Sequence, residues 1–165
     1  MGKVLISDPD KCTGCTRCEA VCSLNKRGKI SVKYSRIKVV RYEMDAFSYP
    51  VFCLNCEVPY CAQVCPSGAL WKNPTTGVVE QNADKCVGCK MCLLACPFGA
   101  INFVDGKASK CDLCGGDPTC VKYCESKVLS YVDSSEATVG KREILARSMM
   151  ENIRTNQTLI SNKPS

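Results

Sequence analysis

The sequence predicts an α+β fold of two pseudo-symmetric halves, made of short β-hairpins and helical turns, with one further helix near the C-terminal end. Three observations lead to this prediction. Sixteen cysteines stand in four groups with an internal repeat, short β-type segments separate the groups, and an amphipathic segment follows the last group. At 165 residues the chain has the size of one domain. It therefore has little room for anything besides the cysteine-rich part.

Each cysteine group ends in the spacing x3-Cys. The first and third groups share the spacing Cys-x2-Cys-x2-Cys-x3-Cys, whereas the second and fourth have a longer middle gap. In chain order the groups are Cys12, Cys15, Cys18 and Cys22; Cys53, Cys56, Cys61 and Cys65; Cys86, Cys89, Cys92 and Cys96; and Cys111, Cys114, Cys120 and Cys124. The flanking residues repeat as well, because Asp10-Lys-Cys-Thr-Gly returns as Asp84-Lys-Cys-Val-Gly. The chain is therefore a doubled unit.

Short strands are predicted between the groups, at residues 4–6, 37–42, 78–80, 101–104 and 128–132. A turn is expected at 73–77 and a hairpin tip at 105–106. Helical turns should begin near Arg17, Glu57, Lys90 and Pro118, each carrying the last two cysteines of its group. Residues 1–133 form the main domain, residues 134–154 an amphipathic helix and residues 155–165 a polar tail. This helix either packs on the chain's own surface or docks a partner subunit.

The consecutive x2, x2, x3 run is specific to cysteines that hold [4Fe–4S] clusters. The first three cysteines wrap one cubane in a tight loop, and the fourth leaves on a helical turn and ligates the other cluster of a pair. Gly14 and Gly88 lie inside such loops, where a positive φ and a close approach of backbone N–H groups to sulfur are needed. Because all four ligands are present in every group, the sequence predicts four [4Fe–4S] clusters on sixteen cysteine ligands.

Zinc sites and disulfides are the main alternatives for so many cysteines. Structural zinc needs two cysteine pairs some distance apart, which the consecutive runs do not provide. Residues 1–10 contain no export signal, so reduced thiols in the cytoplasm are expected. The absence of histidine excludes Cys/His zinc fingers, Cys-x-x-Cys-His haem attachment, histidine-ligated Rieske centres and a histidine general base. Four thiolates per group leave no iron open, so no catalytic residue is predicted.

The formal net charge of +6 counts every cysteine as a neutral thiol. Four oxidised clusters, each about −2 with its thiolates, would bring the loaded protein to roughly −2. We therefore expect no nucleic-acid partner. No stretch approaches the ~18 uninterrupted apolar residues of a membrane span, so we also expect no direct membrane insertion.

These four motifs, in this order from Cys12 to Cys124, resemble the four-cluster ferredoxin-like subunits of molybdenum and tungsten oxidoreductases, hydrogenases and carbon monoxide dehydrogenase. The group includes the iron–sulfur subunits of the DMSO reductase and formate dehydrogenase type. Residues 35–43, the motif at 111–118 and the C-terminal segment look most like the small subunit beside tungsten aldehyde oxidoreductase-type enzymes or carbon monoxide dehydrogenase.

The resemblance implies two ferredoxin-like dicluster halves, an inner pair at residues 53–96 and an outer pair that joins 12–22 with 111–124. The implied ligand sets are Cys12, Cys15, Cys18 with Cys124; Cys53, Cys56, Cys61 with Cys96; Cys86, Cys89, Cys92 with Cys65; and Cys111, Cys114, Cys120 with Cys22.

The resemblance also implies a function, that of a non-catalytic subunit that relays single electrons. These would pass through four clusters between a large tungsten or molybdenum catalytic subunit and a second redox partner, such as a flavoprotein or a ferredoxin. A free-standing polyferredoxin is the alternative.

Charged residues near the third and fourth groups suggest different reduction potentials. Asp112, Asp117 and Glu125 surround the fourth group, whereas Lys85 and Lys90 flank the third. Because local negative charge disfavours adding an electron, the cluster of Cys111, Cys114 and Cys120 is expected to have the lower potential. The alternative is that these charges are solvated and screened.

Overall fold

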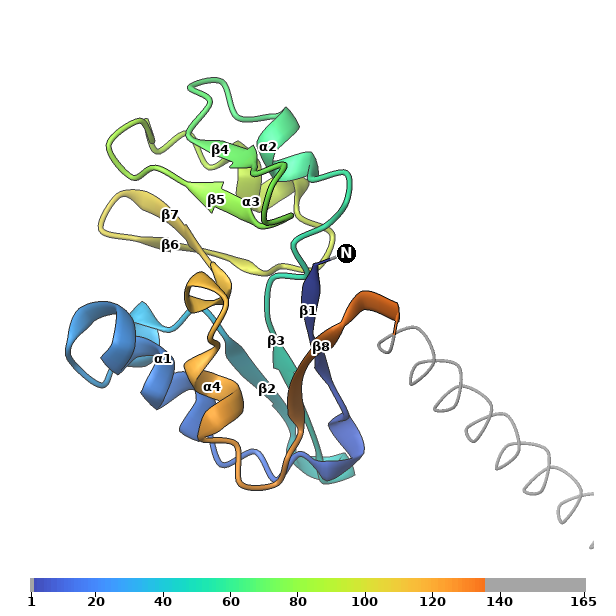
Figure 1. The fold of residues 1–165 in the computed structure, drawn as a ribbon. Coiled ribbons are helices and arrows are strands. Elements are labelled where there is room, and N and C mark those ends of the chain that lie inside the picture. The colour runs from blue at the N-terminus through green and yellow to red at the C-terminus, as the bar shows by residue number, and fades with distance from the viewer. Residues whose placement is uncertain (1, 136–165) are drawn as a thin grey trace, which may run out of the picture.

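The computed structural model describes residues 2–135 (Figure 1). The helix predicted for residues 134–154 and the tail predicted for 155–165 lie outside these residues, apart from Ser134 and Ser135. None of the helices in the described part of the chain is both long and apolar enough to cross a membrane.

The described residues form four separate antiparallel sheets of two strands each. The pairs are β1 (Lys3–Ser7) with β8 (Leu129–Asp133), β2 (Lys38–Tyr42) with β3 (Phe47–Val51), β4 (Leu70–Lys72) with β5 (Val79–Gln81), and β6 (Ile101–Val104) with β7 (Lys107–Lys110). All five predicted strands are confirmed, as β1, β2, β5, β6 and β8. Their partners β3, β4 and β7 were not predicted, although the expected turns at 73–77 and 105–106 do connect β4 to β5 and β6 to β7.

Each α-helix within residues 2–135 contains the third cysteine of a group. The helices are α1 (Arg17–Arg27), α2 (Tyr60–Gln63), α3 (Met91–Ala95) and α4 (Thr119–Lys122), with 3-10 turns η1 (Pro9–Lys11), η2 (Val32–Tyr34), η3 (Glu43–Asp45) and η4 (Leu113–Gly115). Only α1 also contains the fourth cysteine, so the prediction that every helical turn carries the last two cysteines is wrong for the other three, which end before the closing cysteine. Helix α1 begins at the predicted residue but continues for eleven residues instead of one turn. It ends at Gly28, which has φ 66° and donates its N–H to the Leu24 oxygen at 2.8 Å. A glycine in this conformation is a common helix terminator.

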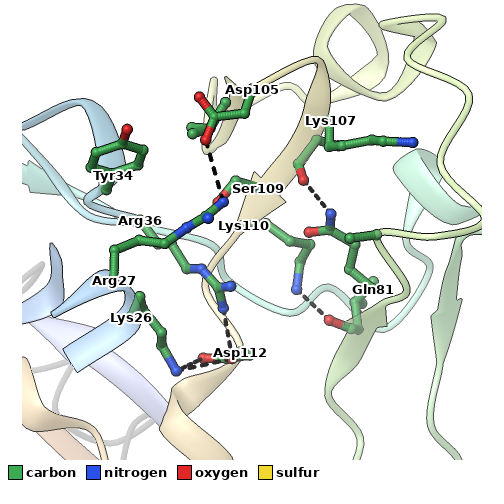
Figure 2. Close-up of a pocket in the computed structure, with 14 residues that line it drawn as sticks. Lys26, Arg27, Tyr34, Arg36, Gln81, Asp105, Lys107, Ser109, Lys110 and Asp112 are labelled. Atoms are coloured by element: carbon green, nitrogen blue, oxygen red, sulfur yellow. Dashed lines mark hydrogen bonds and ion pairs between the residues drawn. The ribbon is translucent and has the colours of Figure 1, made fainter.

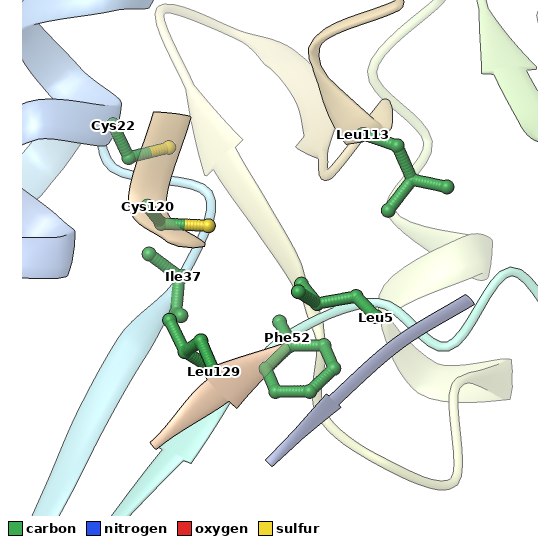
Figure 3. Packing of buried hydrophobic residues seen from close by; sticks show 7 residues of the cluster. All are labelled: Leu5, Cys22, Ile37, Phe52, Leu113, Cys120 and Leu129. Atoms are coloured by element: carbon green, nitrogen blue, oxygen red, sulfur yellow. The ribbon is translucent and has the colours of Figure 1, made fainter. Parts of the chain in front are cut away.

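Two hydrophobic clusters hold these elements together. The first, shown in Figure 3, consists of Leu5, Cys22, Ile37, Phe52, Leu113, Cys120 and Leu129, and the second of Leu70, Cys92, Ile101 and Ala108. Helix α1 packs against α4, and α2 packs against α3. In Figure 1 the elements β4 to β7 with α2 and α3 lie together at one end of the molecule, and α1, α4, β1, β2, β3 and β8 at the other. Buried cysteines are part of both clusters, so each core is continuous with cysteine sites.

Candidate metal centres

Three pockets are each lined by four cysteines. Their empty volumes are similar, at 380, 370 and 350 Å³. In each pocket three cysteines come from one group, and the fourth is the closing cysteine of another group. The sets are Cys12, Cys15, Cys18 and Cys124; Cys53, Cys56, Cys61 and Cys96; and Cys111, Cys114, Cys120 and Cys22. The shared donor set indicates that the three pockets are equivalent sites.

The remaining four cysteines also lie together. Cys92 is buried in the second hydrophobic cluster, with Cys65 and Cys86 packed around it. Burial is the largest cause of the raised pKa of Cys92, and the charges on Cys86, Cys65 and Cys89 raise it further. The structure thus brings Cys86, Cys89 and Cys92 together with Cys65 and forms none of the sixteen cysteines into a disulfide.

The two loop glycines have the backbone conformation that the sequence predicted. The φ of Gly14 is 66° and that of Gly88 is 76°. A Cβ on Gly88 would lie 2.8 Å from the Gly106 oxygen, at the tip of the β6–β7 hairpin, and one on Gly14 would lie 2.7 Å from Ser48 Oγ in the β2–β3 hairpin. Each hairpin therefore lies directly against a cysteine loop, and glycine is needed for this approach as well as for the positive φ.

Side chains from the same two hairpins reinforce these contacts. Arg41 of β2 donates to the Gly14 oxygen at 2.6 Å, and Lys107 of β7 donates to the Cys86 oxygen at 2.5 Å. Thr16 and Lys90, which precede α1 and α3, adopt equivalent left-handed conformations with φ 57° and 63°. Arg41, Lys107 and Thr16 were not predicted as site residues, and Lys90 was predicted only as a helix start and a flanking charge. The internal repeat, which aligns Thr16 with Lys90, is the signal that could have linked the two positions.

Backbone N–H groups donate to several cysteine sulfur atoms. Arg36 donates to Cys22 at 3.3 Å, Asn55 to Cys53 at 3.4 Å and Leu113 to Cys111 at 3.4 Å. Hydrogen bonds of this kind favour the thiolate over the thiol. Where the sulfur ligates a metal centre, they also tune the reduction potential of that centre. The last two lie within the Cys-x-x-Cys loops of the second and fourth groups.

Burial makes the free thiols poor acids. It is the largest cause that raises the pKa of Cys18 to about 12, that of Cys61 to about 11 and that of Cys111 to about 12. Burial alone would raise the pKa of Cys65, but backbone hydrogen bonds and a hydrogen bond with Ser67 together outweigh it and lower the pKa. Without a bound cation most of these thiols would be protonated at neutral pH. Binding to iron deprotonates a thiol, so a metal centre would supply the charge that these buried sites lack.

The acidic residues around the fourth group are not free negative charges. Asp112 bonds both Lys26, at 2.8 Å, and Arg36, at 2.6 Å, as Figure 2 shows. Asp117 pairs with Lys122, and Glu125 with Arg17. Each of these carboxylates thus has a basic partner, which weakens the basis of the predicted lower potential at this site. The order of the two potentials itself stays a prediction.

The cysteine sets surround a volume and do not converge on a point. Within residues 2–135, no three His, Cys, Asp or Glu side chains approach closely enough to hold a single metal ion. A tetrahedral zinc site requires all four sulfur atoms within about 2.3 Å of one ion. In a cubane each thiolate binds a different iron, so the four sulfur atoms stand further apart. The donor geometry fits a cluster better than it fits one ion.

Comparisons with known proteins agree with this donor set. The model of the family described as 4Fe-4S dicluster domain matches residues 44–134, which contain the second, third and fourth cysteine groups. The polyferredoxin-like subunit of an aliphatic sulfonate oxidoreductase from Pyrococcus furiosus is 41% identical over 122 residues, which cover 73% of this chain and 70% of that protein. An uncharacterized ferredoxin from Methanocaldococcus jannaschii is 35% identical over 165 residues, covering 96% of this chain and 92% of that protein.

A subunit of a formate hydrogenlyase is also similar over most of its length. Formate hydrogenlyase subunit 2 of Escherichia coli is 33% identical over 183 residues, which cover 87% of this chain and 88% of that protein. Taken together, the family match and these names support an iron–sulfur, ferredoxin-like protein of the electron-transport and oxidoreductase-subunit type. The chain is α+β in structure, its cysteines suit [4Fe–4S] clusters, and it belongs to the 4Fe–4S dicluster domain family.

Proposed function

We propose that this protein binds four [4Fe–4S] clusters and relays single electrons through them as a non-catalytic subunit, in the cytoplasm. The clusters would be held by Cys12, Cys15, Cys18 and Cys124; Cys53, Cys56, Cys61 and Cys96; Cys86, Cys89, Cys92 and Cys65; and Cys111, Cys114, Cys120 and Cys22. The observation that carries the proposal is the crossing of the cysteine groups: each pocket combines three cysteines of one group with the closing cysteine of another. We further propose that the inner and outer pairs of sets are two pseudo-symmetric halves.

The sets follow one another in a line. Burial is the largest cause of the raised pKa of both Cys111 and Cys120. The charge on Cys53 raises the pKa of Cys111 further, and the charge on Cys18 raises that of Cys120 further. Cys61 packs in the same hydrophobic cluster as the set of Cys65. The order that these neighbours support is the set of Cys12, then that of Cys111, then that of Cys53, and last that of Cys86.

Exposure of the cysteines supports a route with two open ends. Among the sixteen cysteines, Cys15 and Cys89 are the exposed ones, and they belong to the first and the last set in this line. The cysteines of the two central sets are buried or half-buried. Val87 and Met91, which flank Cys89 in the sequence, are also exposed. Electrons would therefore enter and leave at opposite ends, and the two central clusters would connect the ends.

The partners follow from this arrangement and from the relatives. One end would dock a large catalytic subunit, for which the sequence resemblance favours a tungsten or molybdenum oxidoreductase of the aldehyde oxidoreductase type, or carbon monoxide dehydrogenase. The other end would exchange electrons with a second redox protein such as a flavoprotein or a ferredoxin. The polyferredoxin-like and formate hydrogenlyase relatives, both named as subunits, support a role within a complex.

Serine substitution of a closing cysteine tests the crossed sets. Cys96→Ser should alter the same cluster as Cys53→Ser, although Cys96 belongs to the sequence group of Cys92. Electron paramagnetic resonance of the reduced protein would compare the signals lost in the Cys96, Cys53 and Cys92 variants. A Cys96→Ser spectrum that matches Cys92→Ser would show that each sequence group holds its own cluster, and the proposal would be wrong. Cys124→Ser should match Cys12→Ser by the same reasoning.

A free-standing polyferredoxin is the second candidate, because the Methanocaldococcus jannaschii relative, named a ferredoxin, covers nearly the whole chain. Anaerobic affinity purification from native cells distinguishes the two. A stoichiometric large metalloenzyme subunit that co-purifies would support the subunit role. A monomer that exchanges electrons with small carriers and has no such partner would support the free ferredoxin.

A further inference from the structure

Lys110 is a buried lysine at the junction of the two central cysteine sets. It is the last residue of β7, and only 1% of it is exposed. Its ammonium group donates to the Cys111 oxygen at 2.7 Å, to Asn55 Oδ1 at 3.3 Å and to the Val79 oxygen. Figure 2 shows the side chain directed from β7 towards the chain of β5, away from the basic groups that bind Asp112. All three acceptors are neutral.

No carboxylate pairs with Lys110 anywhere in residues 2–135, since none of the ion pairs found there includes it. Three other basic residues that line the same pocket, shown in Figure 2, have carboxylate partners. Lys26 and Arg36 share Asp112, and Arg27 lies beside Asp105. Burying an ammonium group without an anion is strongly unfavourable, even when it is hydrogen-bonded. A negative charge that is not a side-chain carboxylate is therefore expected close to Lys110.

The contacts of Lys110 lead to both central sets. Through the carbonyl of Cys111 it touches the loop that begins the set of Cys111. Through Asn55 it reaches the loop of the Cys53 set, because the N–H of Asn55 donates to Cys53 Sγ at 3.4 Å. Its positive charge also acts on the Cys53, Cys61 and Cys111 thiols, in each case against the effect of burial on the pKa. Lys110 is thus within electrostatic reach of two sites at once.

We propose that Lys110 is the fixed counter-charge of the two central clusters and raises the reduction potential of both. The inference rests on the proposed cluster sets. A [4Fe–4S] cluster with four thiolates is already anionic and becomes more so when it accepts an electron. A buried cation beside it favours the reduced state, and the low dielectric of the interior strengthens the effect. The two central clusters would therefore accept electrons more readily than they would without the charge of Lys110.

Two other lysines that directly precede a cysteine group provide a control. Lysine also precedes the first cysteine of the first and third groups, at Lys11 and Lys85. Both are exposed, and Lys11 pairs with Asp8 at 2.7 Å. Solvent and the carboxylate screen the charge of Lys11. The same residue type in the same sequence position is therefore expected to affect its cluster much less than Lys110 does.

The test is a set of anaerobic redox titrations, monitored by electron paramagnetic resonance, on fully loaded protein. The variants are Lys110→Met, Lys110→Gln, which keeps a hydrogen-bond donor without the charge, Lys110→Arg, which keeps the charge, and Lys11→Met. We expect both neutral Lys110 variants to make reduction of two clusters at least tenfold less favourable, about 59 mV per electron. Signals lost in Cys53→Ser and Cys111→Ser identify those two clusters. In Lys110→Arg the two potentials should stay close to those of the wild type, and Lys11→Met should shift the potential of its own cluster little.

Unchanged potentials in both neutral variants would overturn the proposal, as would an equal shift of all four clusters or an equal shift in Lys11→Met. If the neutral variants fail to keep the central clusters, iron analysis of all three Lys110 variants distinguishes a role of the charge from a role in packing. Retention in Lys110→Arg then supports the counter-charge, whereas loss in all three variants shows a packing role and overturns it. The wild type tests the underlying assignment separately. Fewer than four clusters there would refute the proposed sets, whereas four clusters with unchanged potentials would refute only the role of Lys110.

Discussion

Replacing Gly88 by alanine should weaken the cluster site of Cys86 through two separable costs. The first is backbone strain, because an L-residue at φ 76° costs roughly 1–2 kcal/mol. The second is a clash, since the new Cβ would lie 2.8 Å from the Gly106 oxygen. That oxygen is part of the backbone at the hairpin tip and cannot rotate away. Forcing the hairpin to move adds about 1–3 kcal/mol, so the whole destabilisation should be about 2–5 kcal/mol.

Gly99 is the control that isolates the strain. Its φ is 58°, and an added Cβ would meet nothing within 4 Å. Gly99→Ala should therefore cost only the strain, roughly 1–2 kcal/mol. The difference between the two variants measures the contact between the hairpin and the cysteine loop.

The assay is the rate of cluster loss to an iron chelator under anaerobic conditions, followed by visible absorbance. If loss requires the loop to open, each 1.4 kcal/mol of destabilisation should accelerate it about tenfold. Gly88→Ala should lose one cluster well ahead of the others, and electron paramagnetic resonance should identify it as the cluster that Cys92→Ser removes. Equal rates for the Gly88 and Gly99 variants would refute the steric reasoning, because strain alone would then explain both.

Three further outcomes are expected. Anaerobic analysis of fully loaded protein should give about sixteen iron and sixteen sulfide per chain, and values near half of these, or stoichiometric zinc, would contradict four clusters. Ser48→Ala should relieve the clash in Gly14→Ala, because the contact at 2.7 Å is with a removable hydroxyl, whereas the strain at φ 66° should remain at roughly 1–2 kcal/mol; thermal unfolding of the single and double variants checks this. Asp112→Asn should lower stability by about 1 kcal/mol, a figure discounted because the side chain is 40% exposed. Burial alone would raise the pKa of Asp112, but Lys26 and Arg36 lower it overall. The contribution of Asp112 to stability should therefore be complete above about pH 4 and be lost as the pH falls through the pKa of the folded state. Denaturation of both proteins at pH 5 and pH 7 should give the same difference, and a difference that disappears at pH 5 would contradict this assignment.

The strands that the sequence predicted are those with consecutive apolar or β-branched residues, and the partners that it missed lack this signal. Strand β3 contains Pro50, which usually argues against a strand. Strand β4 has three residues, and β7 reads Lys-Ala-Ser-Lys. These strands form because a hairpin turn returns the chain beside a stronger strand. The turns at 73–77 and 105–106 were predicted, and the weaker strand of each of these two hairpins, β4 before the first turn and β7 after the second, depends on the turn more than on its own residues.

The cysteine groups were visible in the sequence because metal ligation fixes their spacing. The charges around them were not. Lys11, Lys85 and Lys110 each directly precede the first cysteine of a group, yet only Lys110 is buried. Asp112 looked like an excess negative charge, whereas the fold places Lys26 and Arg36 beside it. Pairing and burial depend on contacts between distant segments, which residue spacing alone does not encode.

The pairing of β1 with β8 sets an order for assembly during synthesis. Lys3 lies opposite Asp133, so the first strand has no partner until almost the whole described chain has left the ribosome. The pocket of Cys12, Cys15 and Cys18 likewise includes Cys124. The segment from Cys53 to Cys96, by contrast, contains every cysteine of its own two sets. The inner part of the molecule can thus be completed while the chain is still growing, and the outer part closes afterwards, when its two distant strands meet.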